Sequence, residues 1–198
     1  MKNKYLILDA MGVIFKEADD FQKLYLPYLK KKYNFDIKKA RELYYNKLTL
    51  GMIKLKEFFK ELRIPYNVGF IKKLRIDNKF YEFSKKIKEQ FNLIILSNDC
   101  LELSKEIIKE FKLNEYINNY FTSGELGVRK PNKKIFTRLL RKLKATPRNC
   151  IFVDNILSNL QSAKEIKVNT IYFEREKCKI NTFSKLYQKI NKVVNNDK

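Results

Sequence analysis

Short apolar runs alternate with longer amphipathic stretches over most of this chain. The runs are rich in β-branched and aromatic residues and are nearly continuous in hydrophobicity, which is typical of strands covered by helices on both faces. Most of these runs are followed by a stretch whose apolar residues recur at helical spacing. The alternation predicts an α/β fold, a Rossmann-like parallel sheet between two layers of helices. The strands are expected at residues 5–8, 93–97, 120–123, 151–153 and 170–173, and the later helices at 101–111, 133–144, 157–166 and 180–194.

The segment from residue 16 to about residue 91 lacks a convincing strand pattern. Its apolar residues fall at helical spacing, which predicts three to five amphipathic helices, the first of them kinked at Pro27. A last helix at residues 80–90 leads into the second strand. We therefore expect a core formed by residues 1–15 and 79–198, with a helical bundle inserted at residues 16–78.

Polar residues stand where the expected strands end. Asp9 follows the first strand, Ser97 and Asn98 end the second, and Asp154 ends the fourth. Because the carboxyl ends of parallel strands meet at one edge of a sheet, these side chains are expected to gather there. Lys130 lies in a loop at residues 127–131, and the proline that follows it is expected to open a helix over residues 132–142.

A carboxylate, a hydroxyl, a lysine and a second carboxylate in this order suit phosphoryl chemistry. They would supply a nucleophile, a hydrogen-bond donor for phosphate, a fixed cation and an acid that holds Mg²⁺. A strand-ending aspartate that only caps the next loop is the structural alternative for Asp9 alone.

These four motifs resemble those of the haloacid dehalogenase-like (HAD) hydrolase superfamily, in its subfamily with a helical C1-type cap. The match runs from Lys4 to about Glu174. Asp9 falls on the family's nucleophile, Ser97 on its phosphate-binding hydroxyl and Lys130 on its lysine. Further segments of the sequence also match the family's pattern, at residues 50–53, 57–59, 123–127 and 159–163.

The resemblance implies an activity and a set of site residues. It implies a Mg²⁺-dependent phosphohydrolase that forms an aspartyl-phosphate on Asp9, with Lys130 as the second catalytic residue. Ser97, Asn98 and Lys130 would bind the substrate, a small phosphorylated molecule. The metal ligands would be Asp9, Asp154 and the backbone carbonyl of Met11.

Met11 departs from the family's phosphatases, which carry a second aspartate at this position to protonate the leaving group. Without that acid, general acid–base catalysis worth ~10²–10⁴-fold in rate is lost. The departure favours substrates with a good leaving group, such as acyl or aryl phosphates.

Two alternatives remain open. The L-2-haloacid dehalogenases of the family also lack the second acid and carry Asp-Ala-Tyr-Gly where this chain has Asp-Ala-Met-Gly at residues 9–12. They need no metal and lack an aspartate at the position of Asp154, so Asp154 favours the metal-dependent branch. The other alternative is a catalytically impaired protein that binds phosphate or a metabolite.

Composition narrows the partners and the compartment. The net charge of +21 could indicate nucleic-acid binding. Lysines scattered over every expected helix make nucleic acid an unlikely partner, because specific readers rely on arginine and a recognisable module. The chain lacks histidine, and its three cysteines lack metal-ligand spacing, which excludes triad chemistry based on histidine and argues against a zinc site. Without an apolar run of membrane-spanning length, we expect a cytoplasmic monomer or homodimer.

Two groups of residues in the expected bundle have competing interpretations. Its aromatic residues, among them Phe21, Tyr44 and Tyr45, are expected to form the bundle's own core rather than a substrate-recognition surface. Asp19 and Asp20 follow the first loop, where they could reach the site. We expect them instead to lie solvated in the first turn of a helix, where acids complement the helix dipole.

Overall fold

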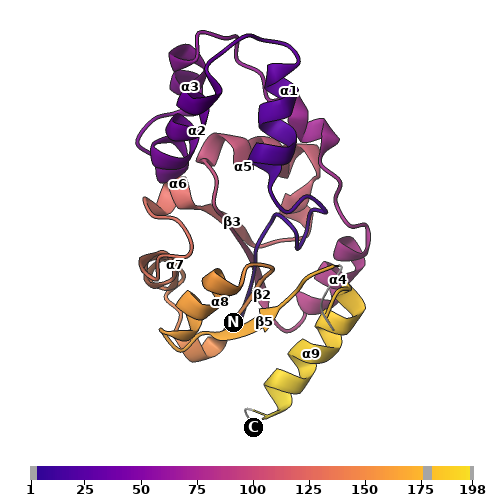
Figure 1. Ribbon diagram of the computed structural model, residues 1–198. Helices are drawn as coiled ribbons and strands as arrows, with labels where there is room; N and C mark the ends of the chain where they lie inside the picture. Colours follow the sequence, from indigo (N-terminus) through magenta and orange to yellow (C-terminus); the bar gives the residue numbers. More distant parts are fainter. Residues whose placement is uncertain (1–3, 176–179, 197–198) are drawn as a thin grey trace.

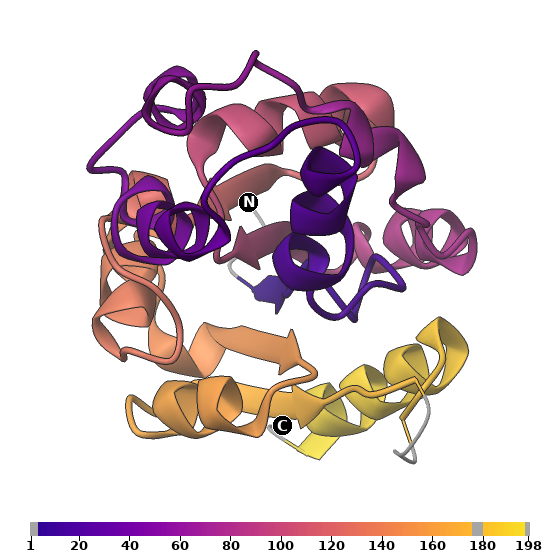
Figure 2. The ribbon, with the colours of Figure 1, turned by 45° about the horizontal axis from the view of Figure 1, so that its top comes forward.

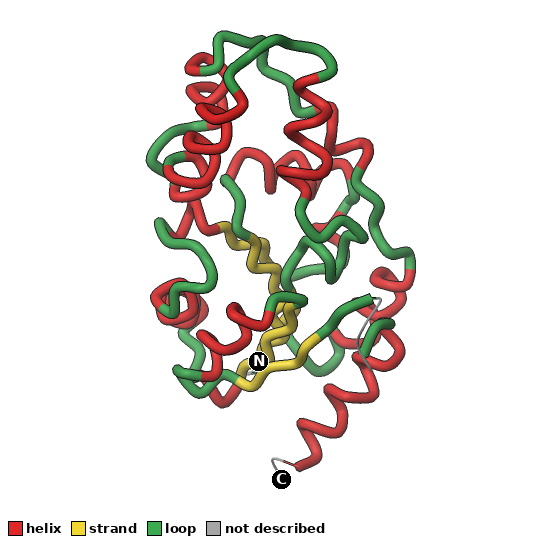
Figure 3. Tube along the Cα trace, in the orientation of Figure 1, coloured by secondary structure: helices red, strands yellow, loops and turns green. Residues whose placement is uncertain are grey.

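The fold centres on a parallel sheet of five strands (Figures 1 and 3). This computed structural model describes residues 4–175 and 180–196. The strand order is β3-β2-β1-β4-β5, with β1 at the centre. The chain adds β2 and β3 on one side of β1 and then crosses over to add β4 and β5 on the other. The strands are β1 (Tyr5–Leu8), β2 (Asn92–Ser97), β3 (Asn119–Thr122), β4 (Cys150–Asp154) and β5 (Asn169–Tyr172).

Side chains alternate across the central strand and divide the core into two layers. Leu6 and Leu8 of β1 lie in one apolar cluster, while Ile7 between them lies in the other. Leu8 pairs in register with Ile95 of β2 and Val153 of β4, and both pack in the same cluster as Leu8. The three central strands, β2, β1 and β4, are buried on both faces, as their continuous apolar runs predict, whereas the edge strands β3 and β5 are partly exposed.

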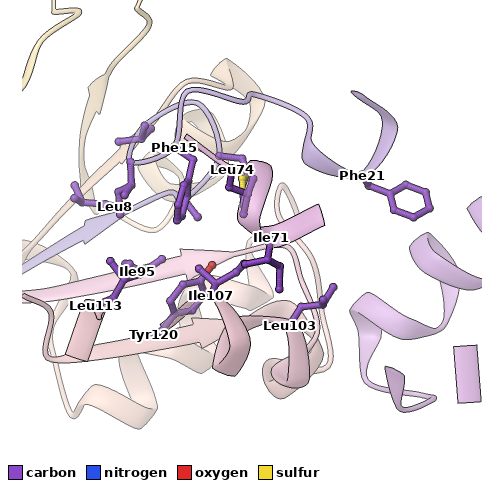
Figure 4. Close-up of a cluster of buried hydrophobic side chains, with 14 of the residues drawn as sticks. Leu8, Phe15, Phe21, Ile71, Leu74, Ile95, Leu103, Ile107, Leu113 and Tyr120 are labelled. Carbon is purple, nitrogen blue, oxygen red and sulfur yellow. The ribbon is translucent and has the colours of Figure 1, made fainter. Parts of the chain in front are cut away.

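Helices cover both faces of the sheet, which confirms the predicted three-layer α/β architecture. Figure 4 shows Leu8 and Ile95 of the sheet in the same cluster as Leu103 and Ile107, which belong to a covering helix. On this face lie α4 (Lys79–Ile87), α5 (Leu101–Glu110) and α9 (Phe183–Asn196), and on the other lie α7 (Lys134–Leu143) and α8 (Leu157–Lys164).

Helices account for the described secondary structure of residues 16–78, between β1 and α4, apart from a single β-bridge at Ile76. Figure 2 looks toward this segment, whose indigo and purple helices lie over the strand ends. Its elements are η1 (Phe21–Tyr25), α1 (Leu26–Lys30), α2 (Ile37–Asn46), η2 (Leu48–Leu50), α3 (Leu55–Glu61) and η3 (Gly69–Lys73). The fold prediction of an inserted helical bundle agrees with this arrangement.

Pro27 does not kink the interior of a helix, in contrast to the prediction. The residues before it form a π-helical turn, closed by the bond from Leu26 N–H to the Phe21 carbonyl, and Pro27 lies in the first turn of α1. A proline is tolerated in a first turn because an N–H there has no helical partner. The wide turn therefore comes before Pro27, and α1 continues from it.

Aromatic side chains lie at the centre of this segment, but Phe21, Tyr44 and Tyr45 also line the cavity described below, so the expectation that they serve only as a core is wrong. Phe21 stacks on Tyr44 with ring centroids 3.6 Å apart, and Tyr25 stacks on Phe70 at 4.0 Å. Such rings bury large apolar areas and gain further from their mutual geometry. These rings belong to the same continuous apolar cluster as Leu8 and Ile95 of the sheet.

Two antiparallel stretches join this segment to the sheet. Lys16 N–H donates to the Arg75 carbonyl at 2.9 Å, and Asp77 N–H donates to the Ile14 carbonyl at 3.1 Å. Farther along, the Ser123 hydroxyl donates to the Thr49 carbonyl at 2.6 Å. These bonds fix the helical segment above the carboxyl edge of the sheet.

Two predicted boundaries are wrong by a few residues. Ser123 was expected in the third strand, but it begins a short helix, α6 (Ser123–Leu126), because Thr122 caps that turn by accepting from Glu125 N–H. Pro131 was expected to open a helix at residue 132, whereas α7 begins at Lys134. Within residues 4–175 and 180–196, no helix combines the length and the apolar character needed to cross a bilayer.

Candidate active site

Lys130 connects two buried carboxylates at the carboxyl edge of the sheet. Its Nζ lies 2.5 Å from Asp9 Oδ1 and 3.0 Å from Asp154 Oδ2, so these two oxygens are at most about 5.5 Å apart. All three residues are almost completely buried. Lys130 thus bridges two carboxylates that end neighbouring strands, which agrees with the expectation that these side chains gather at one edge of the sheet.

The sheet itself places the two aspartates. Asp9 N–H donates to the Val153 carbonyl at 2.9 Å, which continues the β1–β4 ladder one residue past β1. Asp154 is the last residue of β4. Its Oδ1 accepts from Ile156 N–H at 2.8 Å, and its Oδ2 accepts from the Asn159 amide at 2.9 Å. The Asp154 side chain is therefore held from both sides.

Burial and neighbouring charges shift the pKa values of Asp9 and Lys130. Burial, together with repulsion from Asp154, raises the pKa of Asp9 to about 7, although Lys130 opposes the shift. Burial lowers the pKa of Lys130, but the two carboxylates outweigh it and the net shift is upward. Lys130 is thus a permanent cation that offsets part of the carboxylate repulsion.

The Lys130 ammonium uses its three protons within the protein. Besides the two carboxylates, it donates to the Leu96 carbonyl at 2.9 Å. An ammonium has three donors and no acceptor. Binding a phosphoryl oxygen to Lys130 therefore requires the exchange of one of these bonds.

Asn98 holds the main chain of Lys130. Its Oδ1 accepts from Lys130 N–H at 2.8 Å, and its Nδ2 donates to the Lys130 carbonyl at 2.9 Å. Both functional atoms of the amide thus position the lysine loop, and direct contact of Asn98 with a substrate stays a prediction. Ser97, one residue earlier, is buried and lines the same cavity as Asp9.

The loop after Asp9 turns at Gly12. The φ of Gly12 is +83°, and a Cβ at this position would lie 2.4 Å from Asn155 Nδ2, so only glycine fits. This close approach places Asn155 beside the loop, where it lines a different cavity from Asp9. Met11 lines the Asp9 cavity and is 8% exposed.

A cavity of about 230 Å³ opens above these residues. The sheet edge contributes its floor and the helical segment contributes its roof. The floor consists of Asp9, Met11, Ser97, Asn98, Lys130 and Asn159. The roof and walls consist of Ala18, Asp19, Asp20, Phe21, Tyr44, Tyr45, Asp99, Arg129 and Ile156.

The sequence prediction missed several residues of this cavity. Asp99 follows the predicted strand end directly, so its position beside Ser97 and Asn98 was an available signal. Asp19 and Asp20 do cap a helical turn, by accepting from Gln22 N–H and Phe21 N–H. They also line the cavity, so the expectation that they are simply solvated is wrong.

Cys100 and Cys150 do not line the cavity. Burial raises the pKa of the Cys100 thiol strongly and that of Cys150 to about 12, which keeps both as thiols. Cys178 lies outside the described residues. Within the part of the chain that the structure describes, no three acidic or cysteine side chains form a ready-made metal cluster.

The fold and the site define a parallel α/β protein with a buried Asp–Lys–Asp group at the strand ends. A family model for haloacid dehalogenase-like hydrolases matches residues 7–167. The chain therefore belongs to the haloacid dehalogenase-like hydrolase family, as its motifs indicate.

Solved structures of this family share the fold. A HAD family enzyme of Bacteroides thetaiotaomicron, in complex with magnesium and inorganic phosphate, has a TM-score of 0.73 and 20% identity and covers 89% of this chain and 96% of its own. A HAD phosphatase of Thermococcus onnurineus has a TM-score of 0.70 and 18% identity, with 94% and 97% covered. An L-2-haloacid dehalogenase has a TM-score of 0.64 and 12% identity, with 94% and 99% covered.

Curated relatives are much longer than this chain. The drimenol cyclase drtB of Aspergillus calidoustus is 26% identical over 107 residues, which are 52% of this chain and 20% of that protein. The bifunctional epoxide hydrolase 2 of Rattus norvegicus is 30% identical over 88 residues, or 42% and 16%. The matches thus span a fifth or less of these relatives' length.

Proposed function

We propose that this protein is a Mg²⁺-dependent phosphohydrolase that acts on small phosphorylated molecules through an aspartyl-phosphate on Asp9. The observation that carries the proposal is the Lys130 ammonium, which lines the floor of a small cavity beside Asp9 and also pairs with the fully buried Asp154. The fold neighbour that holds magnesium and inorganic phosphate supports this choice of ligand.

Asp9 is the nucleophile in this proposal. One of its oxygens attacks the phosphorus, the bond to the leaving oxygen breaks, and the leaving group departs with the bonding electrons. Attack by water on the phosphorus of the aspartyl-phosphate then releases inorganic phosphate and restores Asp9. Ser97 and Lys130 hold the phosphoryl oxygens, with Lys130 exchanging one of its present hydrogen bonds for a phosphoryl oxygen.

The residues present fit a hard divalent cation. The donors would be carboxylate oxygens of Asp9 and Asp154 and the backbone carbonyl of Met11, and Mg²⁺ prefers oxygen ligands, commonly one or two carboxylates with waters and substrate phosphate. Formal negative charge is in excess there, because two carboxylates face the single Lys130 ammonium. When bound, Mg²⁺ would offset the charge of the phosphoryl group and of the two carboxylates.

Met11 limits which leaving groups depart readily. A thioether can neither donate nor accept the proton that a leaving alkoxide needs. Acyl and aryl phosphates leave as weakly basic anions, so we expect them to react faster than simple alkyl phosphates. We further propose that residues 16–78 form a cap whose roof over the cavity selects the substrate.

A panel of phosphorylated molecules tests this function. The protein is assayed for phosphate release with Mg²⁺ and with a chelator, beside Asp9→Asn and the surface control Asp36→Asn. We expect release that requires Mg²⁺ and Asp9 and persists in the control. Halide release from 2-haloacids without metal would identify a dehalogenase instead, and tight phosphate binding without turnover would identify a binding protein.

A further inference from the structure

The roof of the active-site cavity is acidic. Asp19 and Asp20 enter it from the helical segment, and Asp99 enters it from the loop after β2. Arg129 is the one cationic residue of the roof and walls among the described residues. Formal charges in this half of the cavity therefore sum to a net negative value, in a chain whose net charge is +21.

Helix capping does not account for all of these carboxyl oxygens. One oxygen each of Asp19 and Asp20 accepts a backbone N–H, at 3.0 and 2.9 Å. Asp99 is only 2% exposed. Its Oδ1 accepts from Cys100 N–H at 2.7 Å, but its buried Oδ2 has no hydrogen-bond partner among the described residues. A buried oxygen without a donor is costly, and Asp99 lines the cavity, so this carboxyl group is a candidate partner for a donor on a ligand.

Aromatic side chains beside these acids already bind a cation. The Arg129 guanidinium lies 4.8 Å from the Tyr45 ring centroid, and its Nη1 donates to the Tyr45 carbonyl at 3.2 Å. The neighbouring Tyr44 also lines the cavity and stacks on Phe21. Carboxylates together with aromatic faces are the combination that recognises ammonium groups.

We propose that the leaving half of the substrate carries an ammonium group, which binds between Asp20, Asp99 and the aromatic wall at Tyr44. This inference rests on the proposed function, because it assumes that the phosphoryl group binds above Asp9. The cavity of about 230 Å³ restricts the substrate to a small phosphorylated amine.

The carboxyl groups of Asp20 and Asp99 have raised pKa values, and a cationic ligand between them would lower these values. Burial, with the nearby Asp19 and Glu17, raises the pKa of Asp20 to about 6, although the Phe21 N–H opposes the shift. Burial and Asp20 raise the pKa of Asp99 well above its usual range, while Cys100 N–H and Arg129 oppose it. An ammonium placed between the two carboxyl groups would relieve their repulsion and favour their charged forms.

The same ammonium would compensate for Met11. A positive charge close to the leaving oxygen stabilises the negative charge that develops as the bond to phosphorus breaks. A phosphorylated amine is therefore a better substrate for a site without a general acid than an uncharged alkyl phosphate of the same size.

Two probes of equal length test the inference, 2-aminoethyl phosphate and n-propyl phosphate. They differ in an ammonium against a methyl group. Their dissociation constants are measured by calorimetry with Mg²⁺ on the Asp9→Asn protein, which prevents turnover. We expect the amine to bind at least about tenfold more tightly. Adding Asp20→Asn or Asp99→Asn should remove this preference, whereas adding Asp36→Asn, at an exposed helix cap that lines no part of the cavity, should retain it.

Equal affinities for the two probes, no binding of either, or a preference that persists in both Asp20→Asn and Asp99→Asn would overturn the inference. Wild-type turnover of p-nitrophenyl phosphate separates this inference from the proposed function. Turnover without an amine preference refutes the inference alone. An amine preference without turnover of any phosphate ester refutes the hydrolase and leaves only the ammonium-binding site of the inference.

Discussion

The side-chain amide of Asn98 forms two hydrogen bonds with the main chain of Lys130, one to its N–H and one to its carbonyl. The ammonium of the same lysine reaches back to Asp9 and Asp154. Strand β2 thus fixes the lysine loop at its base, and the two carboxylates fix its tip. The geometry of the site depends on this connection between two loops that lie 32 residues apart.

Replacing Asn98 should loosen Lys130. Asn98→Ala removes both hydrogen bonds and leaves two main-chain groups to find other partners, which should cost about 1–3 kcal/mol of unfolding free energy and lower turnover at least about tenfold. Asn118→Ala is the matched control, because its Oδ1 accepts from Leu93 N–H at the opposite end of β2. It should lower stability without an equal loss of turnover. Equal turnover losses in the two variants would contradict the positioning role of Asn98.

Removing the Lys130 charge should harm both activity and folding. Lys130→Met leaves Asp9 and Asp154 buried beside each other without a cation, and breaking a buried ion pair costs about 3–5 kcal/mol. Urea unfolding measures this loss, and phosphate release measures turnover, which we expect to fall close to background. The assigned role of Lys130 would be wrong if the Lys130→Met protein retained wild-type turnover.

Asp20 should reduce stability above its pKa. Its folded-state pKa is about 6 against an ordinary value of 3.8, so the folded protein holds this proton more tightly than the unfolded chain does. The carboxyl group therefore destabilises the fold progressively as the pH rises from about 4 through 6. Asp20→Asn keeps a capping side chain and should raise unfolding free energy at pH 8 by about 1–2 kcal/mol, a value reduced for its partial exposure, with little gain at pH 4.

The control for this pH dependence is Asp36→Asn, which also replaces a capping aspartate but at an exposed position. Thermal unfolding of both variants at pH 4 and pH 8 gives the comparison. A gain for Asp20→Asn that is the same at the two pH values would show that desolvation of the charged carboxyl is not its origin.

The sequence predicts the floor of the site because its residues are fixed by local patterns. Asp9 and Ser97 of the floor, and Asp154 buried beside them, each end an apolar run, and parallel strands bring such ends together whatever the rest of the chain does. The roof could not be predicted in this way. Asp20 and Tyr44 approach Asp99 only because the helical segment packs over the sheet edge, which depends on contacts such as Ser123 with Thr49.

Local capping chemistry also explains why the third strand ends before Ser123. Thr122 accepts from Glu125 N–H and starts a helical turn where continued apolar character predicted a strand. A side chain in the flanking residue thus outweighs the propensity of the run itself.

Restoring an acid at position 11 tests the leaving-group argument. Met11→Asp should raise turnover of uncharged alkyl phosphates toward the ~10²–10⁴-fold that acid catalysis contributes, and should leave aryl phosphates nearly unchanged. Met52→Asp is the control, because Met52 is 69% exposed and lines no part of the cavity. A wild-type protein that hydrolyses n-propyl phosphate as fast as phenyl phosphate would show that Met11 does not limit the reaction.

The nucleophilic role of Asp9 can be measured directly by trapping the phosphorylated protein. Rapid acid quenching after mixing with a radiolabelled acyl or aryl phosphate and Mg²⁺ should leave label covalently bound to the wild-type chain, and hydroxylamine should release it, as expected for an acyl phosphate. The Asp36→Asn control should retain the label, and Asp9→Asn should carry none. Phosphate release without any trapped label on the wild-type chain, or label retained in Asp9→Asn, would contradict the proposed mechanism.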